Sequence, residues 1–112
     1  MRYRTEITGT FKKAFKHLYK RHPSLVADVK ELREELMQNP QLGTDLGGGF
    51  RKIRMRITSK GRGKSGGARV ITFTVIATMD ETEINLLYIY DKADCSSISM
   101  SEMEELRRAN GL

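Results

Sequence analysis

The segment FRKIRMRITSKGRGKSGGARVITF, residues 50–73, decides the fold because its polar and apolar residues alternate. The apolar positions recur at every second residue, at Ile53, Met55 and Ile57. A period of two is typical of a strand with one buried face, so a strand is predicted from Phe50 onward. The glycine-rich residues 60–67 then connect it to a second strand over residues 68–78.

The same segment is strongly basic. Residues 50–69 contain eight cations and no acid, in a chain of 112 residues with a formal net charge of +6. Protein surfaces normally intersperse both signs of charge, so this block indicates a polyanionic partner. Lys52, Arg54 and Arg56 are predicted to project from one face of the sheet, with Arg69 beginning the neighbouring strand.

The rest of the chain predicts an α+β fold in the order β-α-α-β-β-β-α. We expect a small, mainly antiparallel sheet covered on one face by an N-terminal helical hairpin, and a short C-terminal helix. The other expected elements are a strand over residues 2–7, a loop over residues 41–49, a turn over residues 79–82 and a strand over residues 83–90.

Polar residues at fixed offsets predict where the helices begin. Thr10 and Ser24 are expected to cap the two helices of the hairpin. For the C-terminal helix both Ser99 and Ser101 are candidate caps, and Ser101 with Glu104 forms the pattern of a capping box.

Length and composition predict one domain over residues 1–112, since a chain of this size hides roughly 65% of its unfolded surface on folding. The residues are 38% hydrophobic and 30% charged, which is typical of a soluble globular protein. We find no apolar run near 18 residues and no signal peptide, and therefore expect no membrane partner. The single cysteine, Cys95, excludes an internal disulfide and fits a reducing compartment, so a cytoplasmic location is predicted.

The Gly-Lys-Ser sequence at residues 63–65 is weak support for a nucleotide site. A phosphate-binding P-loop needs a glycine five residues before the second one, where this chain has Thr58, and it opens into a helix rather than a strand. Metal chemistry is also disfavoured, because His17 and His22 are five residues apart and the basic block contains no carboxylate. We expect surface histidines, no metal and no cofactor.

Nucleic-acid binding agrees better with the residues. The basic strand and loop could contact phosphates, and Tyr88 and Tyr90 share one face of the third long strand, where they could stack on bases. A solvated outer face beside a flexible hairpin is the plain alternative for an isolated Lys-x-Arg-x-Arg pattern.

Two stretches of the chain resemble the HigB-like branch of the RelE toxin superfamily, the ribosome-dependent endoribonuclease toxins of type II toxin–antitoxin modules. They are NPQLGTDLGGGFRKIRMRITSKGRGKSGGARVITF and INLLYIYDKADCSSIS. The shared features are a glycine before an RKIR-type strand, a GRGK-SGG loop, an arginine opening the next strand, and a strand that ends in Tyr-x-Lys. The resemblance covers residues 39–99, over half of the chain, and implies a RelE-like fold.

The resemblance implies a toxin that enters the ribosomal A site and cleaves messenger RNA without a metal, by attack of the ribose 2′-oxygen on the adjacent phosphate. The matching positions for catalysis are Lys52, Arg54, Arg69 and Lys92. Together with the residue pattern it assigns RNA or ribosome contacts to Arg56, Lys60, Arg62, Lys64, Tyr88 and Tyr90. The general base and acid stay open, because no tyrosine follows Tyr90 and Lys-Ala-Asp stands where these toxins usually have Lys-Asn-Glu.

The partners implied are the ribosome with its message and a cognate antitoxin, expected to carry a helix-turn-helix domain and to be the only route to operator DNA. Two other functions stay open. A non-catalytic RNA- or ribosome-binding module would use the same cations as a clamp. A ParE-like gyrase inhibitor would use the same scaffold, although gyrase binding needs no ladder of basic residues on the sheet.

Overall fold

A computed structural model, which describes residues 2–61, 63 and 66–112, contains a five-stranded sheet in the order β1-β5-β4-β3-β2. Its strands are β1 (Arg2–Ile7), β2 (Thr44–Gly47), β3 (Phe50–Met55), β4 (Ala68–Ile76) and β5 (Glu81–Asp91). Only β1 and β5 are parallel, and the other neighbours are antiparallel. The α+β, RelE-like fold with a mainly antiparallel sheet is confirmed.

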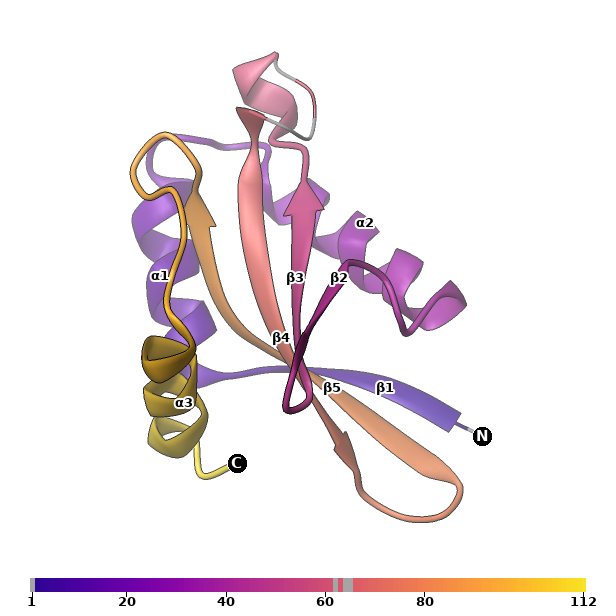
Figure 1. The fold of residues 1–112 in the computed structure, drawn as a ribbon. Helices are drawn as coiled ribbons and strands as arrows, with labels where there is room; N and C mark the ends of the chain where they lie inside the picture. Colours follow the sequence, from indigo (N-terminus) through magenta and orange to yellow (C-terminus); the bar gives the residue numbers. More distant parts are fainter. Residues whose placement is uncertain (1, 62, 64–65) are drawn as a thin grey trace.

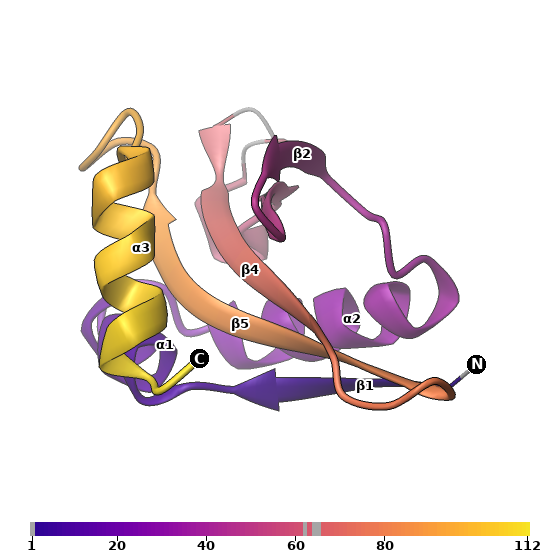
Figure 2. The same cartoon turned by 60° about the horizontal axis from the view of Figure 1, so that its bottom comes forward.

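Helices cover both faces of this sheet (Figures 1 and 2). Helices α1 (Gly9–Tyr19) and α2 (Leu25–Gln38) pack on one face, and α3 (Met100–Ala109) packs on the other. The N-terminal hairpin covers one face as predicted, and the C-terminal helix covers the opposite one. The apolar residues of α3, Met103 and Leu106, pack against the β5 residues Leu87 and Tyr90 rather than joining the core under α1 and α2.

The larger core lies between the sheet and the helices α1 and α2. It contains the alternating residues Ile53, Met55 and Ile57, each at most 5% exposed. Arg54 between them is exposed, which confirms the predicted period of two. The apolar stripe of α2 closes this core from the other side through Leu25, Val29, Leu32 and Leu36.

Two helices begin earlier than their expected caps. Thr8, not Thr10, caps α1, and its hydroxyl accepts from the backbone N–H of Phe11 at 3.2 Å. Ser99, not Ser101, caps α3 and forms a capping box with Glu102. Ser24 precedes α2 as expected, but its hydroxyl donates to Asp28 at 2.8 Å instead of capping the backbone.

Residues 41–49 were expected as a loop, yet they contain β2. The strand pairs with β3 through Thr44 opposite Lys52, and the chain then reverses through Gly48 and Gly49 at positive φ. Backbone pairing in a tight hairpin creates this strand although its sequence, TDLG, has low strand propensity. In the described part of the chain, no helix is both long and apolar enough to cross a membrane.

Candidate nucleic-acid interface

The strands β3, β4 and β5 place basic and aromatic residues in two rows on one face of the sheet. Arg54 is opposite Arg69, which is opposite Tyr90. In the next row Lys52 is opposite Ile71, which is opposite Tyr88. Residues directly opposite each other in antiparallel strands project from the same face, so Lys52, Arg54, Arg69, Tyr88 and Tyr90 form one surface, hereafter the basic face. The structure thus brings together five of the residues predicted from the sequence.

On the basic face, the solvent exposure of the cations is higher on β3 than on β4. Arg54 is exposed and Lys52 is half-buried, whereas Arg69 is only 4% exposed and donates from Nη1 to the backbone oxygen of Ala68 at 3.2 Å. Arg54 and Arg69 are directly opposite each other on neighbouring strands, so both guanidinium groups belong to the same part of the basic face. Two arginines opposite each other on one face of the sheet are a candidate position for a phosphate.

Tyr90 contributes a buried hydroxyl to the basic face. The residue is 5% exposed, and its hydroxyl has no hydrogen-bond partner among the residues that the structure describes. Burial raises the pKa of Tyr90, Cys95 adds to the rise, and the nearby charge of Arg69 opposes it. The phenol therefore stays protonated at neutral pH and is available as a donor. Its ring lies 6.2 Å from that of Tyr88, and only the half-buried Tyr88 is open enough to stack on a base.

Arg56 and Lys92 stand at the end of the sheet nearest to Arg69. Arg56 directly follows β3, and Lys92 directly follows β5, where its backbone N–H donates to Gly67 at 3.1 Å. Both residues are exposed. They extend the cationic surface beyond the strand ends, while Arg62 and Lys64 lie outside the described residues.

Lys60 is not part of the basic face. Its ammonium group lies 2.9 Å from a carboxylate oxygen of Asp91 and donates to the backbone oxygen of Gly66 at 3.0 Å, and the side chain is only 15% exposed. These contacts join the short helix η1 (Thr58–Lys60) to Gly66 and to the end of β5. The position gives Lys60 a structural role in the free protein.

Asp91 is the centre of a buried polar cluster that sequence reasoning missed. Besides Lys60 it contacts Nε2 of His22 at 3.1 Å and accepts from the N–H of Ala93 at 2.9 Å. Burial alone would raise the pKa of Asp91, but Lys60, Ala93 and His22 outweigh that effect and lower it. The expected surface position of His22 is wrong, since its side chain is 14% exposed and ion-paired or hydrogen-bonded to Asp91. His22, Lys60 and Asp91 are far apart in sequence, so no local pattern could reveal the cluster.

Gly67 determines how the chain enters β4. A Cβ atom at this position would lie 2.2 Å from the backbone oxygen of Met55 and 3.1 Å from the backbone nitrogen of Ile57. Only a glycine permits this close approach of the two backbones. Arg69, two residues later, is thereby fixed relative to β3.

The connection between β3 and β4 joins two antiparallel strands and is not followed by a helix, which agrees with rejecting a P-loop. Among the described residues, no three His, Cys, Asp or Glu side chains cluster closely enough to hold a metal ion.

The comparison with protein families gives a match over nearly the whole chain. The model of the family described as RelE toxin of RelE / RelB toxin-antitoxin system matches residues 6–111. The matched range includes every residue of the basic face and the N-terminal helices, which carried no motif of their own.

Proposed function

The chain belongs to the RelE toxin family of toxin–antitoxin systems, and on that premise we propose that it is a ribosome-dependent endoribonuclease that cleaves messenger RNA in the A site. Membership implies a cognate antitoxin as partner. The proposal adds the reaction, its substrate and the residues that perform it. The HigB-like branch within the family stays a prediction.

The observation that carries this proposal is the basic face itself. Three cations and two tyrosines converge from three strands, with Arg54 opposite Arg69 and Arg69 opposite Tyr90. A rigid sheet holds catalytic groups more accurately than a loop does. Such a cluster suits a phosphodiester, whose charge grows during cleavage.

In the proposed reaction the ribose 2′-oxygen attacks the adjacent phosphorus and the bond to the 5′-oxygen breaks. The proton of the 2′-hydroxyl passes to a base, and the leaving 5′-oxygen receives a proton from an acid. The products are a 2′,3′-cyclic phosphate and a 5′-hydroxyl end. Arg69 and Arg54 would stabilise the charge on the phosphate oxygens, and Lys52 and Lys92 would stand on either side of them.

The arrangement supports catalysis over simple clamping. A clamp requires only exposed cations, whereas Arg69 is almost fully buried beside the buried hydroxyl of Tyr90. Fixed charges and donors in a site with little water stabilise a transition state more strongly than those in solvent. A gyrase inhibitor would have no use for this cluster.

The decisive experiment incubates the purified protein with ribosomes stalled on a defined message and maps the RNA ends by toe-printing. We expect cleavage in the A site that yields a 5′-hydroxyl end, which polynucleotide kinase labels without prior phosphatase. Stalled ribosomes with intact message would identify a clamp. Inhibited DNA supercoiling with unaffected ribosomes would identify a gyrase poison.

The proposed reaction places the protein with ribosomes in the cytoplasm. Operator DNA would be reached only through the antitoxin, which we expect to carry a helix-turn-helix domain. The reaction requires no cofactor, and Arg62 and Lys64 are proposed to add RNA or ribosome contacts beside Arg56.

A further inference from the structure

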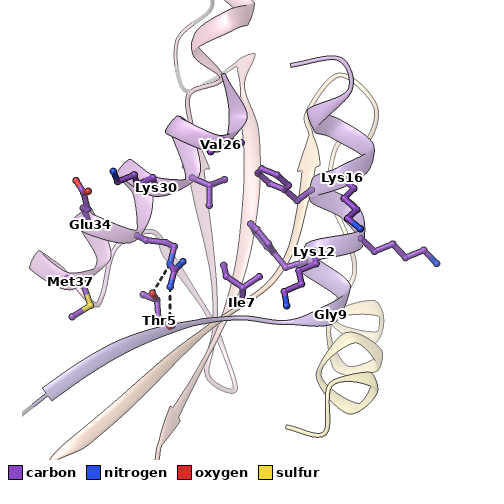
Figure 3. A pocket seen from close by; sticks show the side chains of 14 residues that line it. Thr5, Ile7, Gly9, Lys12, Lys16, Val26, Lys30, Glu34 and Met37 are labelled. Atoms are coloured by element: carbon purple, nitrogen blue, oxygen red, sulfur yellow. Dashed lines mark hydrogen bonds between the residues drawn. The ribbon is translucent and has the colours of Figure 1, made fainter. Parts of the chain in front are cut away.

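The turn between α1 and α2 meets the sheet at the end where Lys92 lies. On the far side of the sheet from the basic face, the two helices diverge and enclose a groove of about 910 Å³ (Figure 3). At residues 20–24, where the helices are joined, the chain instead reaches the end of β5, and Nε2 of His22 lies 3.1 Å from Oδ2 of Asp91. The polar cluster around Asp91 therefore adjoins a residue proposed to take part in cleavage.

Asp91 holds the backbone that surrounds Lys92. Oδ1 of Asp91 accepts from the N–H of Ala93 at 2.9 Å, and its backbone oxygen accepts from the N–H of Asp94 at 3.0 Å. An aspartate that bonds the backbone two residues on closes a tight local turn. The N–H of Lys92 itself donates to the backbone oxygen of Gly67 at 3.1 Å. The position of Lys92 is thus fixed on both sides, although it is exposed and follows the last residue of β5.

The carboxylate of Asp91 is itself held in place from two other elements. Its side chain is only 3% exposed, and Oδ1 also accepts from the ammonium group of Lys60 at 2.9 Å, while Oδ2 meets His22. Desolvation offsets much of the attraction within a buried ion pair, so apolar packing would stabilise this end of the sheet at least as well. What the polar cluster adds is direction, because each hydrogen bond fixes the orientation of the carboxylate.

The pairing of Asp91 with Lys60 also affects the charge of Lys92. A carboxylate next to a lysine in the chain can attract its ammonium group, but Lys60 and His22 occupy both oxygens of Asp91. In residues 2–61, 63 and 66–112, no ion pair involves Lys92. Its charge is therefore directed to solvent and to a bound anion rather than to its neighbour.

We propose that Asp91 is a positioning residue of the nuclease site, which holds the backbone around Lys92 so that the ammonium group of Lys92 reaches the scissile phosphate. The inference rests on the proposed nuclease function, and Asp91 acts through Lys92 without touching the RNA. A misplacement of about 1 Å at a reacting centre can cost about 10²-fold in rate. Loss of Asp91 should therefore slow cleavage more than it weakens ribosome binding.

The first test is a double-mutant cycle, measured as single-turnover cleavage on saturated ribosomes. Asp91→Ala should slow cleavage about tenfold or more and change ribosome affinity less than about twofold. In a Lys92→Ala background the same substitution should slow cleavage by less than about twofold, because the group that Asp91 positions is already absent. Asp91→Asn keeps an oxygen for the N–H of Ala93 and should recover part of the rate. Equal slowing by Asp91→Ala in both backgrounds would overturn the proposal and leave Asp91 a general structural role.

Asp28 provides a matched control for the loss of a buried acid. It is 6% exposed and accepts from the N–H of Thr58 at 3.0 Å and from its hydroxyl at 2.6 Å, at the other end of η1. Asp28→Asn should slow cleavage by the same factor with and without Lys92→Ala. Melting temperatures must show that every variant is folded at the assay temperature. Coupling of Asp28 to Lys92 as strong as that of Asp91 would overturn a specific role for Asp91.

The second test requires no cleavage and follows amide hydrogen exchange by NMR in the full chain. In Asp91→Ala the amide of Lys92 should exchange at least about tenfold faster, with a smaller change for amides in the centre of β4. In Asp28→Asn the amides of Lys92 and of β4 should change alike. Unchanged protection of Lys92 in Asp91→Ala, or an equal loss at all amides, would overturn the proposal. If the unchanged protein leaves ribosome-bound message intact, the nuclease function fails, whereas the exchange result still decides whether Asp91 holds Lys92.

Discussion

The two faces of the sheet use neighbouring residues of the same strands for opposite purposes. On the face covered by α1 and α2, Ile53, Met55 and Val70 are almost completely buried and have apolar neighbours. On the basic face, one residue along each strand, Lys52, Arg54 and Arg69 gather positive charge. The first face stabilises the fold, and the second gathers the cations on which the proposed function depends. Effects on stability and effects on activity are therefore expected to separate between adjacent positions.

The strongest test of this separation compares two neighbours on β3. Ile53→Ala removes a side chain that is 2% exposed, so we expect a loss of about 2–5 kcal/mol in the free energy of unfolding. Lys52→Ala should change that free energy by less than about 0.5 kcal/mol and reduce cleavage on saturated ribosomes. Denaturant melts and single-turnover cleavage measure the two quantities. Equal losses of stability in the two variants would show that the two faces do not differ in this way.

Substitutions at Arg69 test whether the basic face takes part in catalysis. Arg69→Ala should slow cleavage on saturated ribosomes about 10²- to 10³-fold, the usual cost of losing one contact to transition-state charge. Ribosome association should fall only a few-fold. Arg69→Lys should rescue poorly, since a point charge cannot hold two phosphate oxygens as a planar guanidinium does. Because Arg69 is buried, melting temperatures must show that each variant is folded at the assay temperature. Cleavage at the unchanged rate would favour the clamp.

Substitutions at Gly67 test whether the close approach of the backbones before β4 and at the end of β3 is required for stability and cleavage. In Gly67→Ala the new methyl group would collide with the backbone of β3, so we expect a loss of about 1–3 kcal/mol in stability and slower cleavage. Gly63 is the matched control, because a Cβ there meets nothing within 4 Å. Gly63→Ala should leave stability within about 0.5 kcal/mol. If both variants melted alike, close approach of the strands would not be what requires Gly67.

The polar cluster around Asp91 makes the free energy of unfolding depend on pH. The folded pKa of Asp91 is lowered, so its contribution to stability is fully present above the unfolded carboxyl pKa of about 4 and is lost as pH falls through the folded value. Asp91→Asn should cost on the order of 1–2 kcal/mol at pH 7 and flatten stability below pH 4. Chemical melts at several pH values check both points. An unchanged acid slope in Asp91→Asn would show that other carboxylates dominate.

Substitution of Cys95 should have the smallest effect on stability and cleavage. Its thiol is half-buried and donates to the backbone oxygen of Ser97 at 3.0 Å, a bond that a serine hydroxyl can also make. We expect Cys95→Ser to change stability by less than about 0.5 kcal/mol and to leave cleavage unchanged. Loss of cleavage in a folded, ribosome-bound Cys95→Ser protein would assign a catalytic role to the thiol.

Local patterns predicted the basic face correctly, because a period of two on β3 assigns Lys52 and Arg54 to one side without knowledge of the rest of the fold. The glycines and Arg69 also follow from their neighbours in sequence. What local patterns did not predict depends on distant contacts. The position of α3 depends on Met103 meeting β5, β2 exists only because it pairs with β3, and His22 meets Asp91 across most of the chain. The caps of α1 and α3 lie two residues before the predicted ones, because several Ser and Thr residues can serve as caps at each of these helix starts.

The pairing of β1 with β5 has a consequence for the order of folding. Residues 2–7 pair with residues 81–86. Asn110 also contacts the N-terminal region, since its side-chain amide donates to the hydroxyl of Thr10 at 2.9 Å. Contacts of such high sequence separation form late and slowly. At a synthesis rate of about 5–20 residues per second, α1 and α2 wait several seconds for the sheet that they cover. The five-stranded sheet is therefore complete only after residues 81–91 have been synthesised.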